Sequence, residues 1–105
     1  MKEQYTTDVS MEGKICIVTG ANSGVGFETS LQLAKHGAHL VMVCRDKTRG
    51  ETAKAQIEPE AKGPVDLVLG DLGSLEDVRR LAKTLLDNYP KIHILINNAG
   101  NSAHL

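Results

Sequence analysis

The part of this sequence best suited to chemistry is a glycine-rich loop, TGANSGVG at residues 19–26. It lies between an apolar run at 14–19 and a segment at 25–36 whose apolar residues recur at helical spacing. Glycine lets the backbone approach a ligand without an intervening Cβ, and the unpaired amides at a helix start carry partial positive charge. The glycines therefore predict a cradle for the pyrophosphate of a dinucleotide; they are Gly20, Gly24 and Gly26. The alternative is a glycine-rich turn that binds no ligand.

The elements that must position this loop alternate along the chain. Apolar runs rich in β-branched residues predict strands at 14–19, 39–44, 65–69 and 92–96. The predicted helices run over 25–36 with Gly37 as the stop, from Asp46 or Thr48 to Ile57 with Pro59 ending it, and from Ser74 to a close at Pro90. Strands joined by helical crossovers form a parallel sheet, and near-continuous apolar strands fit a sheet covered on both faces.

Composition narrows the class of protein. The chain has 105 residues, 41% apolar and 24% charged, which is typical of one small globular domain. The net charge is −1 with both signs interspersed, which predicts no nucleic-acid partner, and no apolar run is long enough for a membrane span. Cys16 and Cys44 lie in strand-like runs, so we expect buried, reduced thiols in a cytoplasmic protein, with a disulfide as the alternative. No grouping of Cys and His has metal-ligand spacing.

Three motifs in order carry a family resemblance: T-G-x-x-x-G-x-G in the loop, Asp71-Leu72 after the third predicted strand, and NNAG at 97–100 after the fourth. Together they resemble the short-chain dehydrogenase/reductase family over residues 12–100, and the stretch GKICIVTGANSGVGFETSLQLAKHGAHLVMVCRD resembles its retinol-dehydrogenase-like branch. The resemblance implies a Rossmann-type, doubly wound parallel α/β sheet, truncated to about four strands with three helices. We expect a flexible arm at 1–12, the Rossmann half at 13–100 and a tail at 101–105.

The resemblance also implies roles for individual residues around the loop. Gly20, Gly24 and Gly26, with Val25 between them, would form the phosphate turn, and Asn22 and Ser23 would bond phosphate oxygens or the adenine ribose. Asp71 would accept a hydrogen bond from the adenine amino group, and Leu72 would give a backbone contact beside it. Asn98, Ala99 and Gly100 would line the adenosine-ribose side and brace the central strands. The alternatives are a solvated Asp71 that caps the following helix, and plain turn chemistry for Asn97 and Asn98.

The end of the second strand bears on the choice of nicotinamide cofactor. A carboxylate there holds the ribose hydroxyls of NAD and repels a 2′-phosphate. Here Cys44 takes that position and Arg45 follows, and a guanidinium can pair with the 2′-phosphate, so NADP(H) is favoured over NAD(H). Asp46 would oppose this if the alignment shifted by one residue. Lys47 and Arg49 would either assist or be solvated charges at a helix start.

The family's catalytic motif does not occur in this sequence. The resemblance implies a Tyr-x-x-x-Lys that acts as general acid/base in hydride transfer, but Tyr5 is followed four residues later by Val9, and Tyr89 by His93. Ser102 follows the fourth predicted strand, whereas the resemblance implies a catalytic serine after the fifth. The resemblance also implies a catalytic asparagine on the helix after the fourth strand, which Asn101 does not match by position, and His104 is a lone histidine near the terminus. We therefore assign no catalytic residue.

The sequence therefore predicts the NADP(H)-binding N-terminal part of an oxidoreductase acting on alcohols or carbonyls, inactive alone. The branch resemblance suggests retinoid or steroid-like substrates. One alternative is a non-catalytic nucleotide-binding or regulatory module that associates with a full-length relative, and another is a methyl-transfer domain with an adenosyl cofactor. The fourth strand would have a bare, apolar edge, which makes self-association an expectation.

Overall fold

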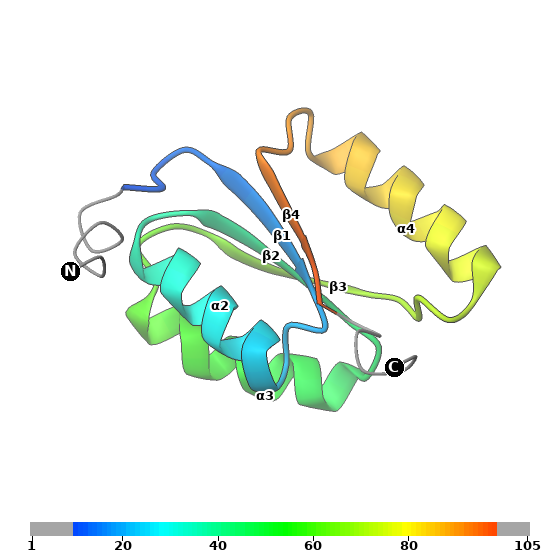
Figure 1. The fold of residues 1–105 in the computed structure, drawn as a ribbon, viewed down its shortest axis with the longest axis horizontal. Coiled ribbons are helices and arrows are strands. Elements are labelled where there is room, and N and C mark those ends of the chain that lie inside the picture. Colours follow the sequence, from blue (N-terminus) through cyan, green and yellow to red (C-terminus); the bar gives the residue numbers. More distant parts are fainter. Residues whose placement is uncertain (1–9, 99–105) are drawn as a thin grey trace.

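The structure, a computed structural model, describes residues 10–98. Within them four strands alternate with three α-helices (Figure 1). The strands are β1 (Ile15–Thr19), β2 (His39–Cys44), β3 (Val65–Leu69) and β4 (Ile94–Asn97). The helices are α2 (Gly24–Lys35), α3 (Lys47–Ile57) and α4 (Leu75–Asn88), and a 3₁₀ turn, η1 (Glu58–Glu60), follows α3. The predicted alternation of strands and helices is confirmed, while residues 1–9 of the expected arm and the expected tail at 101–105 lie outside the described residues.

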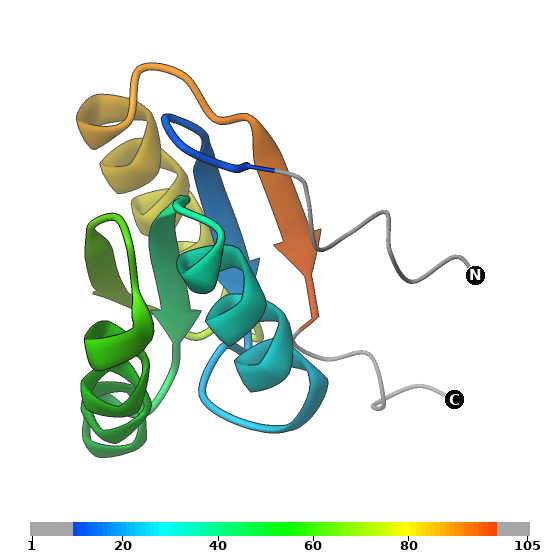
Figure 2. The same cartoon turned by 90° about the vertical axis from the view of Figure 1, so that its left-hand side faces the viewer.

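The strands form one parallel sheet in the order β3–β2–β1–β4. The chain moves outward from β1 through β2 to β3 and then crosses to the other side of β1 to form β4. Helices α2 and α3 cover one face of the sheet, and α4 lies over the opposite face (Figures 1 and 2). In open parallel sheets, ligands bind at the carboxyl ends of the strands where the strand order reverses, and here that place is beside β1.

Two apolar clusters fill the two sides of the sheet, because successive side chains of a strand point to opposite faces. Val18, Leu40 and Met42 are fully buried beneath α2 and α3, where they pack with Ala34 and Ile57. The other cluster joins Leu81 of α4 to three strand residues, Ile17, Val41 and Val43. Both cysteines are buried and free, which confirms the prediction of reduced thiols.

Side chains and glycines set the helix ends largely as predicted. Asp46, rather than Thr48, caps α3, because its carboxylate accepts a hydrogen bond from the amide of Arg49. Ser74 caps α4 by accepting from the amide of Asp77. Helix α2 ends just before Gly37, whose φ of +99° is the left-handed conformation that glycine adopts readily.

The fourth strand is shorter and starts later than the predicted 92–96, so that prediction is wrong at both ends. The ladder with β1 begins at Ile94 and continues to Asn97. Before it, the His93 ring accepts a 2.9 Å hydrogen bond from the amide of Ile15 through Nδ1. The backbone amide of His93 also donates a 2.9 Å bond to the carbonyl oxygen of Ile15, so the chain already contacts β1 at this residue, and the regular ladder begins at Ile94.

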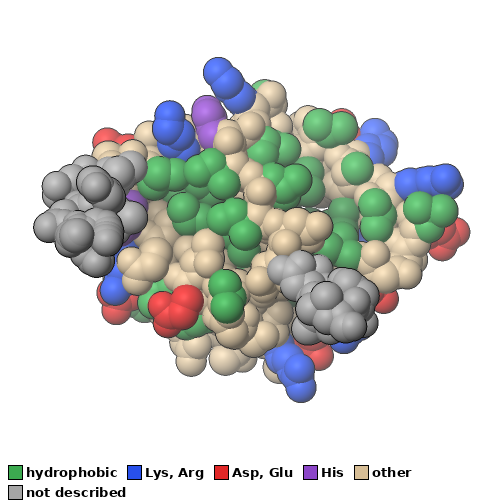
Figure 3. Space-filling view, viewed as in Figure 1, with side chains coloured by type: hydrophobic (Ala, Val, Ile, Leu, Met, Phe, Trp, Pro, Cys, Tyr) green, Lys and Arg blue, Asp and Glu red, His purple; other side chains and the backbone are tan. Residues whose placement is uncertain are grey.

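Cover over the sheet is uneven. Strands β1 and β2 are almost wholly buried, but β4 is an edge strand in the described sheet and Leu95 is 64% exposed. Strand β4 therefore lacks the burial of β1 and β2, and its outer edge is bare in the described sheet, as the sequence predicts. Figure 3 shows hydrophobic side chains at the surface both over the strands and along α4. Among residues 10–98, no helix is long and apolar enough to cross a bilayer.

Candidate functional site

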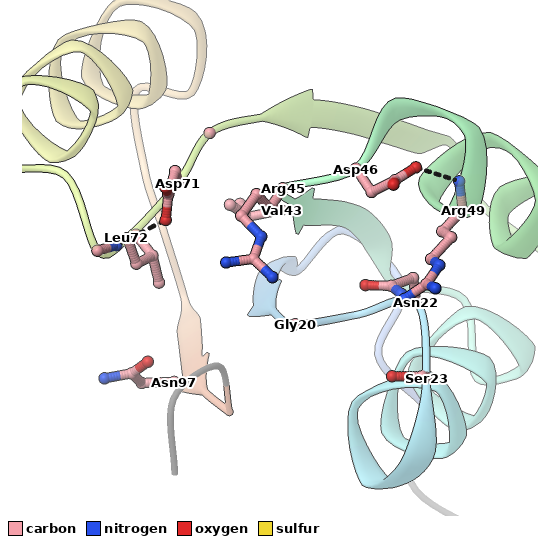
Figure 4. A pocket seen from close by; sticks show the side chains of 12 residues that line it. Gly20, Asn22, Ser23, Val43, Arg45, Asp46, Arg49, Asp71, Leu72 and Asn97 are labelled. Carbon is pink, nitrogen blue, oxygen red and sulfur yellow. Dashed lines mark hydrogen bonds between the residues drawn. The ribbon is translucent and has the colours of Figure 1, made fainter. Parts of the chain in front are cut away.

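A cleft of about 710 Å³ opens at the carboxyl ends of the strands (Figure 4). Four chain segments form its wall: the loop after β1, the end of β2 with the first turn of α3, the loop after β3, and the end of β4. The first two segments contribute Gly20, Asn22, Ser23, Val43, Arg45, Asp46 and Arg49. The last two contribute Gly70, Asp71, Leu72, Gly73 and Asn97. Parallel strands bring these segments together because all of their carboxyl ends lie at one edge of the sheet.

The glycine loop needs its glycines for two different reasons. Gly20 and Gly24 have φ of +63° and +57°, the left-handed region that other residues rarely adopt. Gly26 is required by close packing instead, since a Cβ there would overlap the carbonyl oxygen of Gly20 and lie 2.7 Å from Nδ2 of Asn98. The start of α2 is thus pressed against the end of β1, and the loop between them is tight.

Hydrogen bonds between the end of β4 and the end of β1 hold this loop in place. The Asn98 amide donates a 2.8 Å bond to Oγ1 of Thr19, and its side-chain Nδ2 approaches the carbonyl oxygen of Gly20 at 3.4 Å. Thr19 Oγ1 in turn lies 3.1 Å from Oδ1 of Asn97. Asn98 therefore links the end of β4 to the end of β1 and to the glycine loop that follows it.

The three α-helices of the described region differ in how their N-termini are satisfied. Asp46 caps α3 and Ser74 caps α4, and α4 also carries Glu76 and Asp77 in its first turn. Within α2, no side-chain bond caps the N-terminus at Ser23, and the first turn contains no acidic residue. Because a helix start carries roughly half a positive charge, α2 is the helix of the three that leaves this charge for an external anion.

The wall formed by β2 and α3 is basic. Arg45 and Arg49 both reach into the cleft, with Arg49 extending towards Asn22 (Figure 4). Asp46 lies between them in the sequence, but its carboxylate is bonded to the Arg49 amide at 2.9 Å. Burial raises the pKa of the Cys44 thiol, although the amides of Ala21 and Asn22 act against this, so the thiol adds no negative charge at neutral pH.

The opposite wall carries Asp71 and Leu72 on the loop after β3. The Asp71 carboxylate accepts a 2.8 Å bond from the amide of Gly73, and its own amide donates to Oδ2 of Asp77. Asp71 therefore closes its own turn, whereas Ser74 caps α4, so the alternative of Asp71 as the helix cap is wrong. A carboxylate has acceptor sites to spare beyond this one bond, and Leu72 is 38% exposed beside it.

Some of the site residues predicted from the sequence line the cleft, and others do not. The cleft is lined by Gly20, Asn22, Ser23, Arg45, Asp71 and Leu72. Three others, Gly24, Gly26 and Asn98, shape and brace the loop without lining the cleft, and Val25 is 73% exposed in the first turn of α2. Ala99 and Gly100 lie outside the described residues. Of the two basic residues for which the sequence left open an assisting role, Arg49 lines the cleft and Lys47 does not, and Asn97 is a lining residue that sequence reasoning did not assign to the site.

Comparison with known proteins places the chain in a family. The family model described as short chain dehydrogenase matches residues 14–104. The chain belongs to the short-chain dehydrogenase family. It is 43% identical to mouse retinol dehydrogenase 12 over 96 residues, and 43% identical to bovine dehydrogenase/reductase SDR family member 13 over 95 residues. Each match covers 90% of this chain, but only 30% and 25% of the respective relative, so the chain corresponds to the N-terminal part of a short-chain dehydrogenase similar to the retinol dehydrogenases.

Solved structures of short-chain dehydrogenases show the same Rossmann-type fold. The chain superposes on the Pseudomonas aeruginosa RhlG/NADP complex with a TM-score of 0.79 and 30% identity, covering 88% of this chain and 36% of that one. The L-sorbose reductase of Gluconobacter frateurii, solved with NADPH and L-sorbose, gives a TM-score of 0.79 and 30% identity over 88% of this chain and 35% of that one. The predicted Rossmann-type parallel sheet of four strands with three helices is thus confirmed for residues 10–98 of this chain.

Proposed function

We propose that this chain is the nicotinamide-dinucleotide-binding part of an oxidoreductase that acts on an alcohol or carbonyl compound. Its cleft holds the adenosine and pyrophosphate half of the cofactor. The observation that carries the proposal is the uncapped N-terminus of α2, which faces the cleft through a loop with glycine at Gly20 and Gly24. Two retinol dehydrogenases and two solved complexes with NADP or NADPH among the similar proteins support it.

The residues of the cleft fit the chemistry of such a cofactor. Amides of the loop and the side chains of Asn22 and Ser23 would hold the pyrophosphate, because donors and a helix start stabilise negative charge. On the opposite wall, Asp71 would accept from the adenine amino group and Leu72 would contact the ring. Asn98 with Ala99 and Gly100 would support the ribose side. Gly20 and Gly24, whose φ values lie in the left-handed region, give the loop the tight turn that such a close approach needs.

We propose further that the cofactor is NADP(H) in preference to NAD(H). Arg45 is the first residue after β2 and lines the cleft, where a 2′-phosphate on the adenine ribose would meet it. Cys44 is 2% exposed and its thiol is neutral, so the position at which a carboxylate would select NAD offers no charge. Asp46 is engaged as a helix cap, which draws its carboxylate towards α3.

The bound nicotinamide would supply hydride transfer, but we propose that this polypeptide alone does not catalyse it. Its sequence contains no Tyr-x-x-x-Lys, because neither Tyr5 nor Tyr89 has a lysine four residues on. This chain's own residues bind and orient the adenosine half of the cofactor. Purified chain mixed with NADPH and an aldehyde or ketone should show no loss of absorbance from the reduced cofactor, and turnover would contradict the proposal.

Equilibrium titration tests the binding proposal directly. NADPH, NADH and adenosine 2′,5′-bisphosphate are titrated into the chain, with calorimetry as the readout. We expect NADPH and the bisphosphate to bind and NADH to bind at least about tenfold more weakly, since one charge-assisted contact is lost. Failure of all three to bind would overturn the proposed function, while equal binding of NADPH and NADH would overturn only the preference.

The open side of the sheet supports a second proposal, that the chain associates with a copy of itself or a full-length relative. Strand β4 is an edge in the described sheet, and Leu95 on it is 64% exposed. An exposed apolar edge strand can pair with another chain through its unpaired backbone groups. Sedimentation over a range of concentrations should show a shift from monomer to larger species; a monomer at every concentration would contradict it.

A further inference from the structure

We propose that Asp77 is a positioning residue for the adenine end of the cleft, because its carboxylate fixes the peptide group from which the Asp71 side chain extends. This inference rests on the proposed function, in which Asp71 accepts a hydrogen bond from the adenine amino group. Asp77 belongs to α4 and does not line the cleft. It therefore acts on a bound cofactor only through Asp71.

The Asp77 side chain departs from the usual bonding at a helix start. In a capping box, the acidic side chain at the third helical position bonds the amide of the capping residue. Here the capping residue, Ser74, donates its amide instead to the carbonyl oxygen of Asp71 at 3.0 Å. Oδ2 of Asp77 reaches further back along the chain and accepts from the Asp71 amide at 2.8 Å. The carboxylate is thus bonded to the wall of the cleft rather than to the start of its own helix.

Other bonds fix the loop on each side of this peptide group. The Gly70 amide donates a 2.9 Å bond to the carbonyl oxygen of Cys44, which ties the loop to β2. The Asp71 carboxylate accepts a 2.8 Å bond from the Gly73 amide. Because a peptide group is planar, the bond between the Asp71 amide and Asp77 also limits the direction in which the Asp71 side chain leaves the backbone.

The charge of Asp77 is itself held in place. Arg80 lies on the same helix, where its Nη2 is 3.4 Å from Oδ1 of Asp77 and donates a 3.3 Å bond to the carbonyl oxygen of Leu69 at the end of β3. The bond from the Asp71 amide, with a contribution from Arg80, holds the pKa of the Asp77 carboxyl below its ordinary value of 3.8. Asp77 is therefore ionised at neutral pH, and a hydrogen bond to an ionised acceptor is stronger than one between neutral groups.

The test measures how well the chain distinguishes adenosine 5′-monophosphate from purine riboside 5′-monophosphate, which lacks the amino group. Wild type should bind the adenosine nucleotide about tenfold more tightly by calorimetry, since a hydrogen bond to a charged acceptor is lost with the other ligand. Asp77→Ala should lower this ratio to less than about threefold, because the Asp71 side chain is no longer held towards the ligand. Asp77→Asn keeps an oxygen that can accept from the Asp71 amide, so it should retain most of the ratio.

Glu76→Ala is the matched control for the helix itself. Glu76 carries the same charge in the same first turn of α4, and among the described residues its side chain makes no hydrogen bond to the Asp71 loop. Both acidic residues favour the positive helix start, so a loss that comes only from a weaker helix should appear in both variants. Glu76→Ala should keep the wild-type ratio, and circular dichroism checks that each variant is folded at the temperature of the titration.

A merely structural role of Asp77 predicts a different result. Asp77→Ala would then weaken the binding of both nucleotides alike and keep their ratio, which would overturn the positioning role. If that variant does not fold, Arg80→Gln replaces it, because it removes the cation that holds the carboxylate and should lower the ratio about twofold or more. An unchanged ratio in Arg80→Gln would then overturn the inference.

The outcomes for Asp77 and for the proposed function are distinct. If wild type binds both nucleotides equally, Asp71 makes no bond to the amino group, and the inference fails while the proposed binding of the cofactor stands. If wild type binds neither nucleotide nor NADPH, the proposed function itself fails. A ratio lost in Asp77→Ala and kept in Glu76→Ala supports the inference.

Discussion

The Tyr89 hydroxyl donates a 2.7 Å hydrogen bond to Oδ2 of Asp66, and the same oxygen lies 2.8 Å from Nε2 of His39. The rings of His39 and Tyr89 meet edge to face, with centroids 5.5 Å apart. Tyr89 ends α4, whereas Asp66 and His39 lie near the amino ends of β3 and β2. One carboxylate therefore ties the end of α4 to the sheet, at the opposite end of the strands from the cleft.

Replacing Tyr89 with phenylalanine should destabilise the fold modestly. The change keeps the ring but removes the donor to a half-buried carboxylate, so the free energy of unfolding should fall by about 1 kcal/mol. Urea denaturation followed by circular dichroism measures it. Lys83→Gln, which breaks the exposed 3.0 Å pair with Asp87, is the control and should cost less than about 0.5 kcal/mol. Equal losses in the two variants would show that the Tyr89 hydrogen bond contributes no more to stability than the exposed Lys83–Asp87 ion pair.

The same cluster predicts how stability depends on acid. Burial alone would raise the pKa of the Asp66 carboxyl, but hydrogen bonds from Tyr89 and His39 outweigh it and hold that pKa below its ordinary value of 3.8. A carboxyl whose pKa is lower in the folded state stabilises the fold above its unfolded-state pKa, and the contribution is lost as pH falls through the folded-state pKa. The free energy of unfolding should therefore decline below about pH 4.

Asp66→Asn tests that assignment, because it removes the titrating group. Urea titrations at a series of acidic pH values should show a shallower decline for Asp66→Asn than for wild type. Tyr89→Phe should lie between them, since it removes one of the bonds that lower the Asp66 pKa. Parallel curves for all three proteins would assign the acid sensitivity to other groups.

Gly26→Ala should disrupt the junction between β1 and α2. The new Cβ would overlap the Gly20 carbonyl oxygen and crowd Nδ2 of Asn98, so we expect a loss of about 2 kcal/mol or more in the free energy of unfolding. Adding Asn98→Ala should relieve only part of this loss, because the backbone of Gly20 cannot be trimmed. Unfolding curves for the single and double variants measure the difference, and an unchanged Gly26→Ala protein would contradict the close packing.

Arg45→Asp should invert the proposed preference between cofactors. A carboxylate at this position would repel a 2′-phosphate and accept bonds from ribose hydroxyls, so the ratio of NADPH to NADH affinity should fall by at least about a hundredfold. Fluorescence titration with the two reduced cofactors measures the ratio. Undiminished affinity for NADPH would show that Arg45 does not meet the phosphate.

Leu95→Lys should reduce self-association if β4 is the contact. Lysine on an exposed edge strand opposes pairing with another strand, and Leu95 has ample solvent access for the substitution. The control is Leu86→Lys on α4, where Leu86 is 69% exposed on a helix surface. Sedimentation should show a weaker association for Leu95→Lys alone. A shift caused only by Leu86→Lys would place the contact on α4 instead.

The sequence was informative where local chemistry decides structure. Gly37 ends α2, Ser74 starts α4 and the buried runs form strands, because capping, backbone freedom and apolar periodicity act over a few neighbouring residues. The predicted start of β4 was wrong for a non-local reason. At His93 the ring accepts from the amide of Ile15 and the backbone amide donates to the Ile15 carbonyl, and no feature of residues 92–96 alone reveals these distant partners.

By itself the sequence determined the order of the elements, the glycine loop and the family to which the chain belongs. Tertiary structure decided which side chains share the cleft: it brought Asn97 and Arg49 to the wall, and placed Asn98 against Gly20 across 78 residues of chain. The physical reason is register. A parallel sheet fixes which residues of separate strands end at the same edge, and that alignment depends on pairing between segments far apart in the sequence.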